Sequence, residues 1–241
     1  MKGKFFVGLI TIFTGEYLWS QNLVPNSSFE EVHQSFCGDF SSTLQFEMSL
    51  KDWVLPTSSK PRISDKSVSP SCWNFIGEMD EVQPHSGIRM ALLCFFSDSN
   101  YRSYVEVPLT LELEKGRTYY TEVWVHSYPD QSKVSNNIGL HFSDSLIRSY
   151  RDTTSIITNL PFMGVLSVEP QVNHSEILRT TSKWICLKTS FVAKSNAKYL
   201  IIGNFYNDEE TDTLPNSDIN TNSNSVFYYI DDVYVGLKPK N

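Results

Sequence analysis

NLVPNSSFEEV, at residues 22–32, and FYYIDDVYV, at residues 227–235, decide the fold of this 241-residue chain. Each stretch sets a pair of acidic residues among apolar and aromatic residues that favour strands. The first indicates a short strand that runs into a Pro-Asn-Ser turn. Because the two ends of a domain usually lie close together, we expect the first and last strands to lie side by side in one sheet.

The sequence between these ends is rich in strand signals and poor in helix signals. Alternating residues predict a strand whose one face is formed by Ile185, Leu187, Thr189 and Phe191. Similar runs cover residues 89–96, 103–113, 118–128, 137–142 and 199–206. The Lys115-Gly116 pair between two of these runs predicts a hairpin. Many short strands separated by turns predict an all-β fold, an antiparallel β-sandwich or jelly roll.

Three long stretches, residues 56–87, 143–181 and 206–225, lack a clear pattern. Irregular loops of that length are uncommon in compact domains and often carry function. The alternative is that they contain short strands without a recognisable signal. Both interpretations stay open at the level of the sequence.

Composition excludes some classes of partner. The chain is 40% hydrophobic and 13% aromatic, which is enough for a packed core, and its formal net charge is −7. Nucleic-acid binders carry basic patches, so we expect no nucleic-acid partner. The acidic balance also disfavours an anionic membrane surface.

The first twenty residues form a segment of a different kind. A basic start, MKGK, precedes the apolar run FFVGLITIF and a small residue at Ser20, which is the pattern of a signal peptide. We therefore expect residues 1–20 to be removed and residues 21–241 to form a single β-sandwich domain that is exported. The apolar run is too short to span a bilayer, and no later run approaches the required length.

The chain has four cysteines. Cys37 and Cys72 lie in loop-like sequence, so in an oxidising compartment we predict a disulfide between them, although four cysteines allow three pairings. Cys94 and Cys186 lie in strand-like runs and are expected to be small packed residues. The absence of CxxC and of histidine pairs at ligand spacing disfavours a zinc site.

The acidic pairs at the two ends point to a cation. Two carboxylates that meet in one sheet repel unless a positive charge lies between them, and calcium binds carboxylate and main-chain oxygens. We predict a structural calcium held by one residue of each pair, since neighbours on a strand face opposite ways. The candidate ligands are Glu30, Glu31, Asp231 and Asp232. The alternative is that these acids only end strands in solvent.

NLVPNSSFEEV and YYIDDVYV resemble the opening and closing strands of galactose-binding-like jelly rolls, which include carbohydrate-binding modules of xylanases and cellulases. Several such modules hold a structural calcium at this place, so the resemblance implies the same ion here. It also implies that the sandwich is a galactose-binding-like jelly roll.

A narrower resemblance spans nearly all of the chain after the signal peptide. It is to the N-terminal domain of exported OmpA-family proteins of Gram-negative gliding-type bacteria. The motifs that carry it, in order, lie at residues 22–30, 37, 53–57, 72, 101–104, 138–144, 184–193, 199–211 and 228–233. The resemblance implies a cell-envelope protein that is periplasmic, outer-membrane-associated or extracellular. We expect no peptidoglycan-binding domain to follow, and the family supplies no biochemical role or protein partner.

Aromatic residues beside polar ones mark a candidate ligand surface. On the predicted strand 118–128, Tyr120, Glu122, Trp124 and His126 share one face. Sugars pack on aromatic rings while polar groups bind their hydroxyls, so this mixture favours glycan binding. The candidate ligand-binding residues are Trp73, Tyr101, Arg102, Tyr104, Trp124, His126 and His141. The alternative is that the tryptophan and the tyrosines pack within the sandwich.

Catalytic patterns are weak. GDFS at residues 38–41 displaces the serine of a lipase-like GDS start, and no late Asp-x-x-His pair follows. Paired carboxylates for glycoside cleavage are available among Asp208, Glu209, Glu210, Asp231 and Asp232, and they leave a hydrolase or lyase as a minor alternative. We therefore predict a non-enzymatic module that recognises a glycan or another cell-envelope polymer. A structural or adhesion component without a small ligand is the main alternative.

Overall fold

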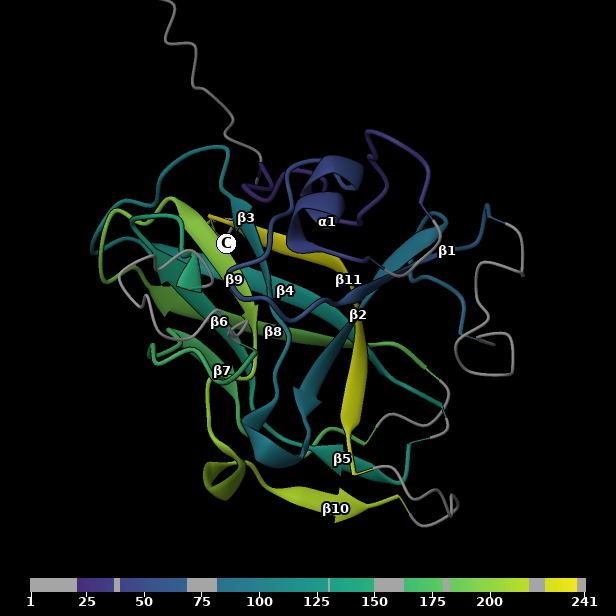
Figure 1. Cartoon of the computed structure of the whole chain (residues 1–241). Coiled ribbons are helices and arrows are strands. Elements are labelled where there is room, and N and C mark those ends of the chain that lie inside the picture. The colour runs from purple at the N-terminus through teal and green to yellow at the C-terminus, as the bar shows by residue number, and fades with distance from the viewer. Residues whose placement is uncertain are drawn as a thin grey trace, which may run out of the picture.

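The computed structural model describes residues 21–36, 40–68, 82–129, 131–149, 163–179, 183–216 and 224–237. Two antiparallel sheets pack face to face, as Figure 1 shows. The five-stranded sheet has the order β1-β2-β11-β4-β8 and the four-stranded sheet the order β3-β9-β6-β7. Since every strand pair is antiparallel and the last strand lies in the middle of the larger sheet, the fold is the predicted antiparallel β-sandwich of the jelly-roll type.

The strands of the two sheets come from all parts of the chain. The larger sheet consists of β1 (Arg62–Asp65), β2 (Arg89–Phe96), β4 (Thr118–Ser127), β8 (Ile185–Val192) and β11 (Val226–Gly236). The smaller sheet consists of β3 (Val105–Pro108), β6 (Ile138–Ser143), β7 (Val172–His174) and β9 (Tyr199–Gly203). A separate ribbon pairs β5 (Lys133–Ser135) with β10 (Thr213–Pro215), and the remaining elements are α1 (Thr43–Ser49) and the short helices η2 (Asp98–Asn100) and η4 (Asp208–Glu210).

The core lies between the sheets and follows from alternation along the strands. On β4, Tyr119, Val123 and Val125 point into the core, whereas Tyr120, Glu122 and Trp124 point outward. On the opposing sheet, Leu200 and Ile202 of β9 face them. Side chains of both sheets form one buried apolar cluster, so each strand presents one face to the core and one to the outside.

The two ends of the sandwich lie side by side, as the sequence predicts. The amide of Leu23 donates to the carbonyl of Val235 at 2.7 Å. Asn22 extends this contact, because its side chain donates to the carbonyl of Val233 at 2.8 Å and accepts from the amide of Val235 at 3.0 Å. The first segment is held to the last strand without forming a regular strand itself.

A bulge interrupts β11 between Asp231 and Tyr234, where the pairing with β4 shifts. Asp232 has φ +43°, a left-handed backbone in which Asp is tolerated better than most residues. The carboxylates of Asp231 and Asp232 therefore both contact Ser86, in the segment before β2. The expectation that adjacent acids face opposite ways is wrong for this pair. Tyr234 remains on the outward side of the sheet, opposite Glu122.

Three local predictions have clear outcomes. The hairpin at Lys115-Gly116 is wrong, because β3 and β4, on either side of it, belong to different sheets. Gly116 does form a turn, with φ +84°. The irregular stretches contain short strands, since β1, β7 and β10 lie within them. The helix α1 was not predicted, although Ser42 caps it by accepting from the amide of Gln45.

The described part of the chain contains no helix with the length and apolar character needed to cross a membrane.

Candidate functional site

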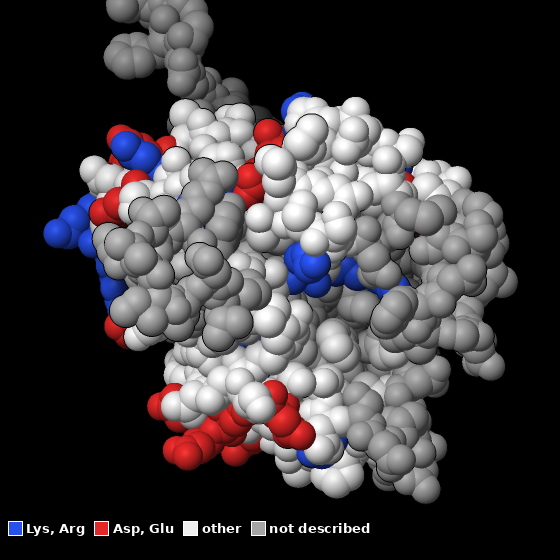
Figure 2. Space-filling view, in the orientation of Figure 1, with Lys and Arg blue, Asp and Glu red and all other residues white. Residues whose placement is uncertain are grey.

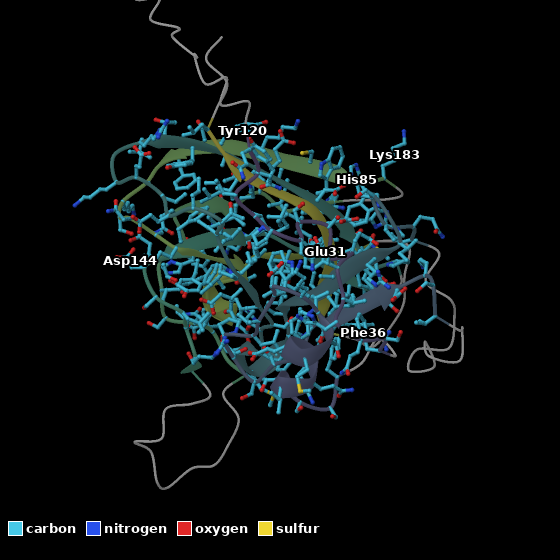
Figure 3. All side chains as sticks on the ribbon, turned by 90° about the horizontal axis from the view of Figure 1, so that it is seen from above. Glu31, Phe36, His85, Tyr120, Asp144 and Lys183 are labelled. Atoms are coloured by element: carbon cyan, nitrogen blue, oxygen red, sulfur yellow. The ribbon has the colours of Figure 1, made fainter. Side chains whose placement is uncertain are left out.

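The candidate site is the side of β4, β8 and β11 that is turned away from the core, which we call the outer face. Its residues include Tyr120, Glu122 and Trp124 of β4, all half-buried. They alternate with buried core residues, so the prediction that these three share one face of a strand is confirmed. His126, the fourth residue predicted for that face, is buried beside Trp184. Figure 3 shows Tyr120 and His85 along the same side of the molecule, and Asp144 on another.

Strand register places the outer-face residues in rows across the sheet. Glu122 pairs with Tyr234 of β11 on one side and with Lys188 of β8 on the other. In the next row along β4, Tyr120 lies between Gly236 and Ser190. Directly opposed side chains lie about 5 Å apart at Cβ, so these rows form a continuous surface.

Tyr234 lies along this surface. Its hydroxyl sits over Gly236, where a Cβ atom would come within 2.2 Å of that oxygen. The missing side chain at Gly236 therefore leaves room for the tyrosine to run along the strand. Its ring comes to 6.1 Å from the ring of Tyr120, so two half-buried aromatic rings lie together at this end of the outer face.

Glu122 occupies the middle of the surface and is bound on the β8 side. The Lys188 Nζ atom lies 3.4 Å from Glu122 Oε2, and the Cys186 thiol donates to the same oxygen at 3.6 Å. The side chains of Glu122 and Lys188 are 26% and 50% exposed, so solvent reaches both charges. Burial and the neighbouring carboxylate of Glu122 raise the pKa of Tyr120, while burial and that carboxylate raise the pKa of Cys186 to about 11.

The other end of the outer face is occupied by the 82–88 segment. The ring of His85 stacks on Trp124, with centroids 3.7 Å apart and planes at 19°. Trp184 stands at an angle to both His85 and His126, with centroid distances of 5.9 and 5.6 Å. Its indole N–H donates to the carbonyl of Gln83 at 2.9 Å. One face of Trp124 is thus covered, while Trp184 is half-buried beside it.

Asp231 and Asp232 hold the 82–88 segment in place. Asp231 accepts from the amide of Ser86 at 3.1 Å, and Asp232 accepts from the Ser86 hydroxyl at 2.7 Å. Asp232 also pairs with the imidazole of His85. Burial raises the pKa of the fully buried Asp231 carboxyl to about 8, and the neighbouring Asp232 contributes to this shift.

Glu30 and Glu31 are placed differently from each other. Glu30 accepts from the amides of Ile88 and Arg89 at 2.9 and 2.8 Å, whereas the exposed Glu31 pairs with Lys51. Glu30 and Asp231 therefore bind opposite ends of one segment, residues 86–89. Each glutamate also has a counter-charge, since Glu31 pairs with Lys51 and Glu30 lies 3.6 Å from the guanidinium group of Arg89.

The predicted calcium site would draw its ligands from these four acids. Within the described residues, no three side chains of His, Cys, Asp or Glu come together to hold a metal. The donors that fit an ion are Glu30 and Asp231, because they meet the same segment, whose main-chain carbonyls are suitable further ligands. A calcium held by these two carboxylates stays a prediction.

Four candidate ligand residues do not lie on β4, β8 or β11: Tyr101, Arg102 and Tyr104, between η2 and β3, and His141 on β6. Arg102 is fully buried, donates to the carbonyls of Tyr101 and Tyr206, and pairs with Asp208 at 2.9 Å. Tyr104 is also fully buried and donates to the carbonyl of Asn204 at 2.6 Å. Arg102 and Tyr104 join loops within the fold, and a glycan has no access to them.

His141 belongs to the other sheet. It points outward from β6 and donates from Nδ1 to the carbonyl of Glu169 at 2.8 Å. Burial lowers its pKa. Trp124 and His141 therefore do not form one site.

On the same sheet as His141, burial raises the pKa of the Glu106 carboxyl to about 7, and this carboxyl accepts from the amide of Ile147 at 3.0 Å.

Figure 2 shows the side of the molecule on which α1 lies. Acidic side chains gather at its lower edge, beside β10, where the helix η4 contributes Asp208, Glu209 and Glu210. The amide of Asn100 donates to the carboxylate of Asp208 at 2.8 Å, and the amide of Asp208 donates to the side-chain oxygen of Asn100 at 2.7 Å. Asp208 therefore holds η4 against η2.

The remaining predicted residues concern the cysteines and a loop tryptophan. Trp73, Cys37 and Cys72 lie outside the described residues, so the predicted disulfide stays a prediction. Cys94 and Cys186 are free. Cys94 is buried as expected, whereas Cys186 lies half-buried on the outer face.

Tyr234, Lys188, Trp184 and His85 belong to the site but were not among the predicted ligand residues. Period-two alternation on residues 185–191 places Lys188 on the strand face opposite Leu187 and Phe191. The sequence does not show that Lys188 pairs with Glu122 across the sheet. Tyr234 follows a bulge, so counting from Asp231 gives the wrong face. His85 lies in a stretch without pattern, and no sequence signal assigns it to Trp124.

Comparisons with known proteins give remote structural likenesses. TmCBM61, solved in complex with β-1,4-galactotriose, has a TM-score of 0.39 at 14% identity, over 91% of this chain and 100% of its own. The CBM22-1 xylan-binding domain of Paenibacillus barcinonensis Xyn10C has a TM-score of 0.41 at 12% identity, over 89% and 94%. The K3 cleaved adhesin domain of Lys-gingipain from Porphyromonas gingivalis has a TM-score of 0.42 at 12% identity, over 91% and 99%.

No protein-family model matches the chain, and the search of curated proteins finds no match. The assignment of a jelly-roll β-sandwich therefore depends on the strand order and register described above.

Proposed function

We propose that the protein is a non-enzymatic binding module that holds a glycan on the outer face of its five-stranded sheet. The observation that supports this is the set of half-buried ring side chains at that face: Tyr120 and Trp124 of β4, Tyr234 of β11, and Trp184, which directly precedes β8. Charged groups, Glu122 and Lys188, lie among the rings. The proposal combines an apolar surface for sugar rings with hydrogen-bonding groups for their hydroxyls.

The physical basis is the shape of a sugar ring. One side of a pyranose presents C–H groups that pack on an aromatic face, and the rim presents hydroxyls that need polar partners. A site that hydrogen-bonds those hydroxyls rejects ligands that lack them, because its own polar groups would lose their partners. The outer face supplies both kinds of contact within one surface.

The length of the surface favours a chain of sugars over a single one. Tyr120 and Trp124 lie four residues apart on β4, which corresponds to roughly 13 Å at the rise of an extended strand. A single hexose is shorter than this distance. An oligosaccharide lying along β4 extends from Tyr120 toward Trp124, as far as the 82–88 segment that covers one face of that ring.

The test measures binding of the protein without its first twenty residues to cell-wall and algal polysaccharides by calorimetry. The variants are Tyr120→Ala, Tyr234→Ala and Gly236→Ala, the last because a Cβ there displaces the Tyr234 hydroxyl. We expect each tyrosine variant to weaken binding roughly tenfold, the loss of about 1.4 kcal/mol that one stacked ring supplies. Gly236→Ala is expected to weaken binding while leaving both rings in the chain.

Tyr199→Ala is the matched control, since Tyr199 is a half-buried strand tyrosine on the other sheet. Equal losses in Tyr199→Ala and Tyr234→Ala would contradict the placement of the site. If no glycan in the panel binds, the alternative holds, and the protein is a structural or adhesion component of the cell envelope.

We also propose that the protein is exported, with residues 1–20 as a cleaved signal peptide. The supporting pattern is the basic start followed by a nine-residue apolar run. Sequencing the N-terminus of the protein recovered from the cell envelope is expected to begin at Gln21. A chain that still begins at Met1 would contradict cleavage.

A further inference from the structure

We infer that Glu122 and Lys188 act together as the polar group that selects an uncharged sugar with neighbouring hydroxyls, and that they exclude uronic acids and amino sugars. This inference depends on the proposed glycan-binding function of the outer face. It adds the class of sugar and the two residues that choose it.

The position of the pair is the first argument. Glu122 lies on the middle strand of the three, with Tyr234 beside it on β11 and Lys188 beside it on β8. Tyr120 and Trp124 precede and follow it on the same face of β4. A sugar that packs on these rings brings its hydroxyl rim to Glu122, because the carboxylate stands between the aromatic side chains.

The chemistry of the pair is the second argument. A carboxylate accepts hydrogen bonds and an ammonium group donates them. The two groups lie 3.4 Å apart, about the separation that two hydroxyls on adjacent carbons can span together. One hydroxyl of such a diol can donate to Glu122 while its neighbour accepts from Lys188. Hydrogen bonds to charged partners are the strong ones, so this pair outweighs a neutral contact.

The balance of charge is the third argument. Glu122 and Lys188 cancel each other at the centre of the surface. The nearest acids on β11, Asp231 and Asp232, are occupied by the 82–88 segment. A uronic acid that pairs with Lys188 brings its carboxylate next to Glu122, and an amino sugar that pairs with Glu122 brings its ammonium group next to Lys188. Each charged ligand therefore gains one attraction, meets one repulsion and breaks the ion pair, whereas a neutral diol bonds to both groups.

Solvent reaches both Glu122 and Lys188, so a ligand can reach them too. The side chains of Glu122 and Lys188 are 26% and 50% exposed, and the thiol of Cys186 and the ammonium group both contact Oε2 of the carboxylate. Contacts on one oxygen hold the orientation of Glu122. An exposed ion pair of this kind contributes little to folding, so its substitution is expected to leave the fold intact.

The experiment compares three groups of oligosaccharides on the mature protein by calorimetry. The neutral group contains cello-, xylo-, manno- and galacto-oligosaccharides, the anionic group oligogalacturonate, and the cationic group glucosamine oligomers. We expect the unmodified protein to bind a neutral member at least tenfold more tightly than either charged group. Tighter binding of a charged group would overturn the inference while leaving the proposed glycan-binding function in place.

Two variants each remove one charge of the Glu122–Lys188 pair and keep a side chain of similar size. Glu122→Gln leaves Lys188 unpaired, so we expect about a tenfold loss for the neutral ligand and a gain for oligogalacturonate. Lys188→Met leaves Glu122 unpaired, and we expect a similar loss for the neutral ligand and a gain for glucosamine oligomers. Unchanged preference in both variants would overturn the inference.

The matched control is a second exposed ion pair, Lys194 with Glu169 at 3.3 Å, which lies elsewhere on the chain. Glu169→Gln and Lys194→Met are expected to change neither affinity nor preference. Melting temperatures of all four variants should agree with that of the unmodified protein. If instead the proposed glycan-binding function is wrong, no oligosaccharide of any group binds.

Discussion

At the scale of the residue, burial changes the chemistry of single side chains, and Glu106 on β3 is an example. Its carboxyl is fully buried, accepts from the amide of Ile147, and has Arg148 3.8 Å away. Burial raises the pKa from 4.5 to about 7 despite these contacts. The folded protein therefore binds a proton at Glu106 more tightly than the unfolded chain does.

The consequence is a pH dependence of stability. The contribution of protonated Glu106 is complete below about pH 4.5, declines as the pH rises, and is lost above about pH 7. Across this window we expect Glu106 to lower the free energy of unfolding by roughly 3 kcal/mol. Glu106→Gln should remove this slope in urea titrations at several pH values, whereas Glu112→Gln, at an exposed site, should retain it. An unaltered slope in Glu106→Gln would contradict the raised pKa.

Sequence alone could not have given this residue its role. VEVP alternates like any strand, and the pattern predicts only that Glu106 faces away from the core. Its burial comes from the residues around Ile147, which fold over the outside of the sheet from a stretch without pattern. The same limit applied to Arg102, whose polar partners come from loops more than one hundred residues away in sequence.

At the scale of the element, the join between the first segment and β11 is held by one side chain. Asn22 accepts from the amide of Val235 and donates to the carbonyl of Val233. Asn22→Ala leaves both backbone groups without these partners. An unmet group costs about 1 kcal/mol at a half-buried site, so the two together cost about 2 kcal/mol, and we expect the melting temperature to fall by roughly 4–8 °C.

Asn196→Ala is the matched control for this prediction. Asn196 also accepts a backbone hydrogen bond, from the amide of Lys115 at 2.9 Å, but at an exposed site. Water replaces that partner, so little change in melting temperature is expected. Similar melting temperatures for Asn22→Ala and the unmodified protein would show that the join at Val235 does not stabilise the sandwich.

Most elements could be predicted from alternation, and the failures have physical causes. The runs that became β4 and β8 are long enough for period-two patterning, and those that became β2 and β11 are long apolar or aromatic runs. The strands β1, β7 and β10 have three or four residues, fewer than the pattern needs. The supposed hairpin at Gly116 failed because a turn signal does not state whether the chain returns to the same sheet or crosses to the other.

At the scale of the whole molecule, the sandwich closes where its two ends meet the segment between the β1 region and β2. Glu30 binds the amides of Ile88 and Arg89, and Asp231 binds the amide of Ser86. One segment thus links the first loop to the last strand. This arrangement was predictable only in part, because the acids at the ends were visible in the sequence while the linking segment was not.

The same arrangement gives the calcium prediction a specific form. If an ion binds Glu30 and Asp231 together with main-chain carbonyls, it stabilises the folded state by an amount that grows with its concentration. At a hundred times the dissociation constant the gain is about 2.7 kcal/mol, so a chelator should lower the melting temperature by several degrees. Differential scanning calorimetry with and without added calcium measures this shift.

Two variants separate calcium from other effects of a chelator. Asp231→Asn should abolish the calcium-dependent shift, because the buried carboxylate is lost, and the neutral amide retains the shape at that position. Glu31→Gln should keep the full shift, since Glu31 is exposed and paired with Lys51. A melting temperature that is the same with chelator and with calcium would remove the ion. The segment would then be held by its hydrogen bonds and by the ion pairs of Arg89 with Asp65 and Glu30, at 2.7 and 3.6 Å. Burial, which raises the pKa of Asp231 to about 8, would then favour its protonated form at neutral pH.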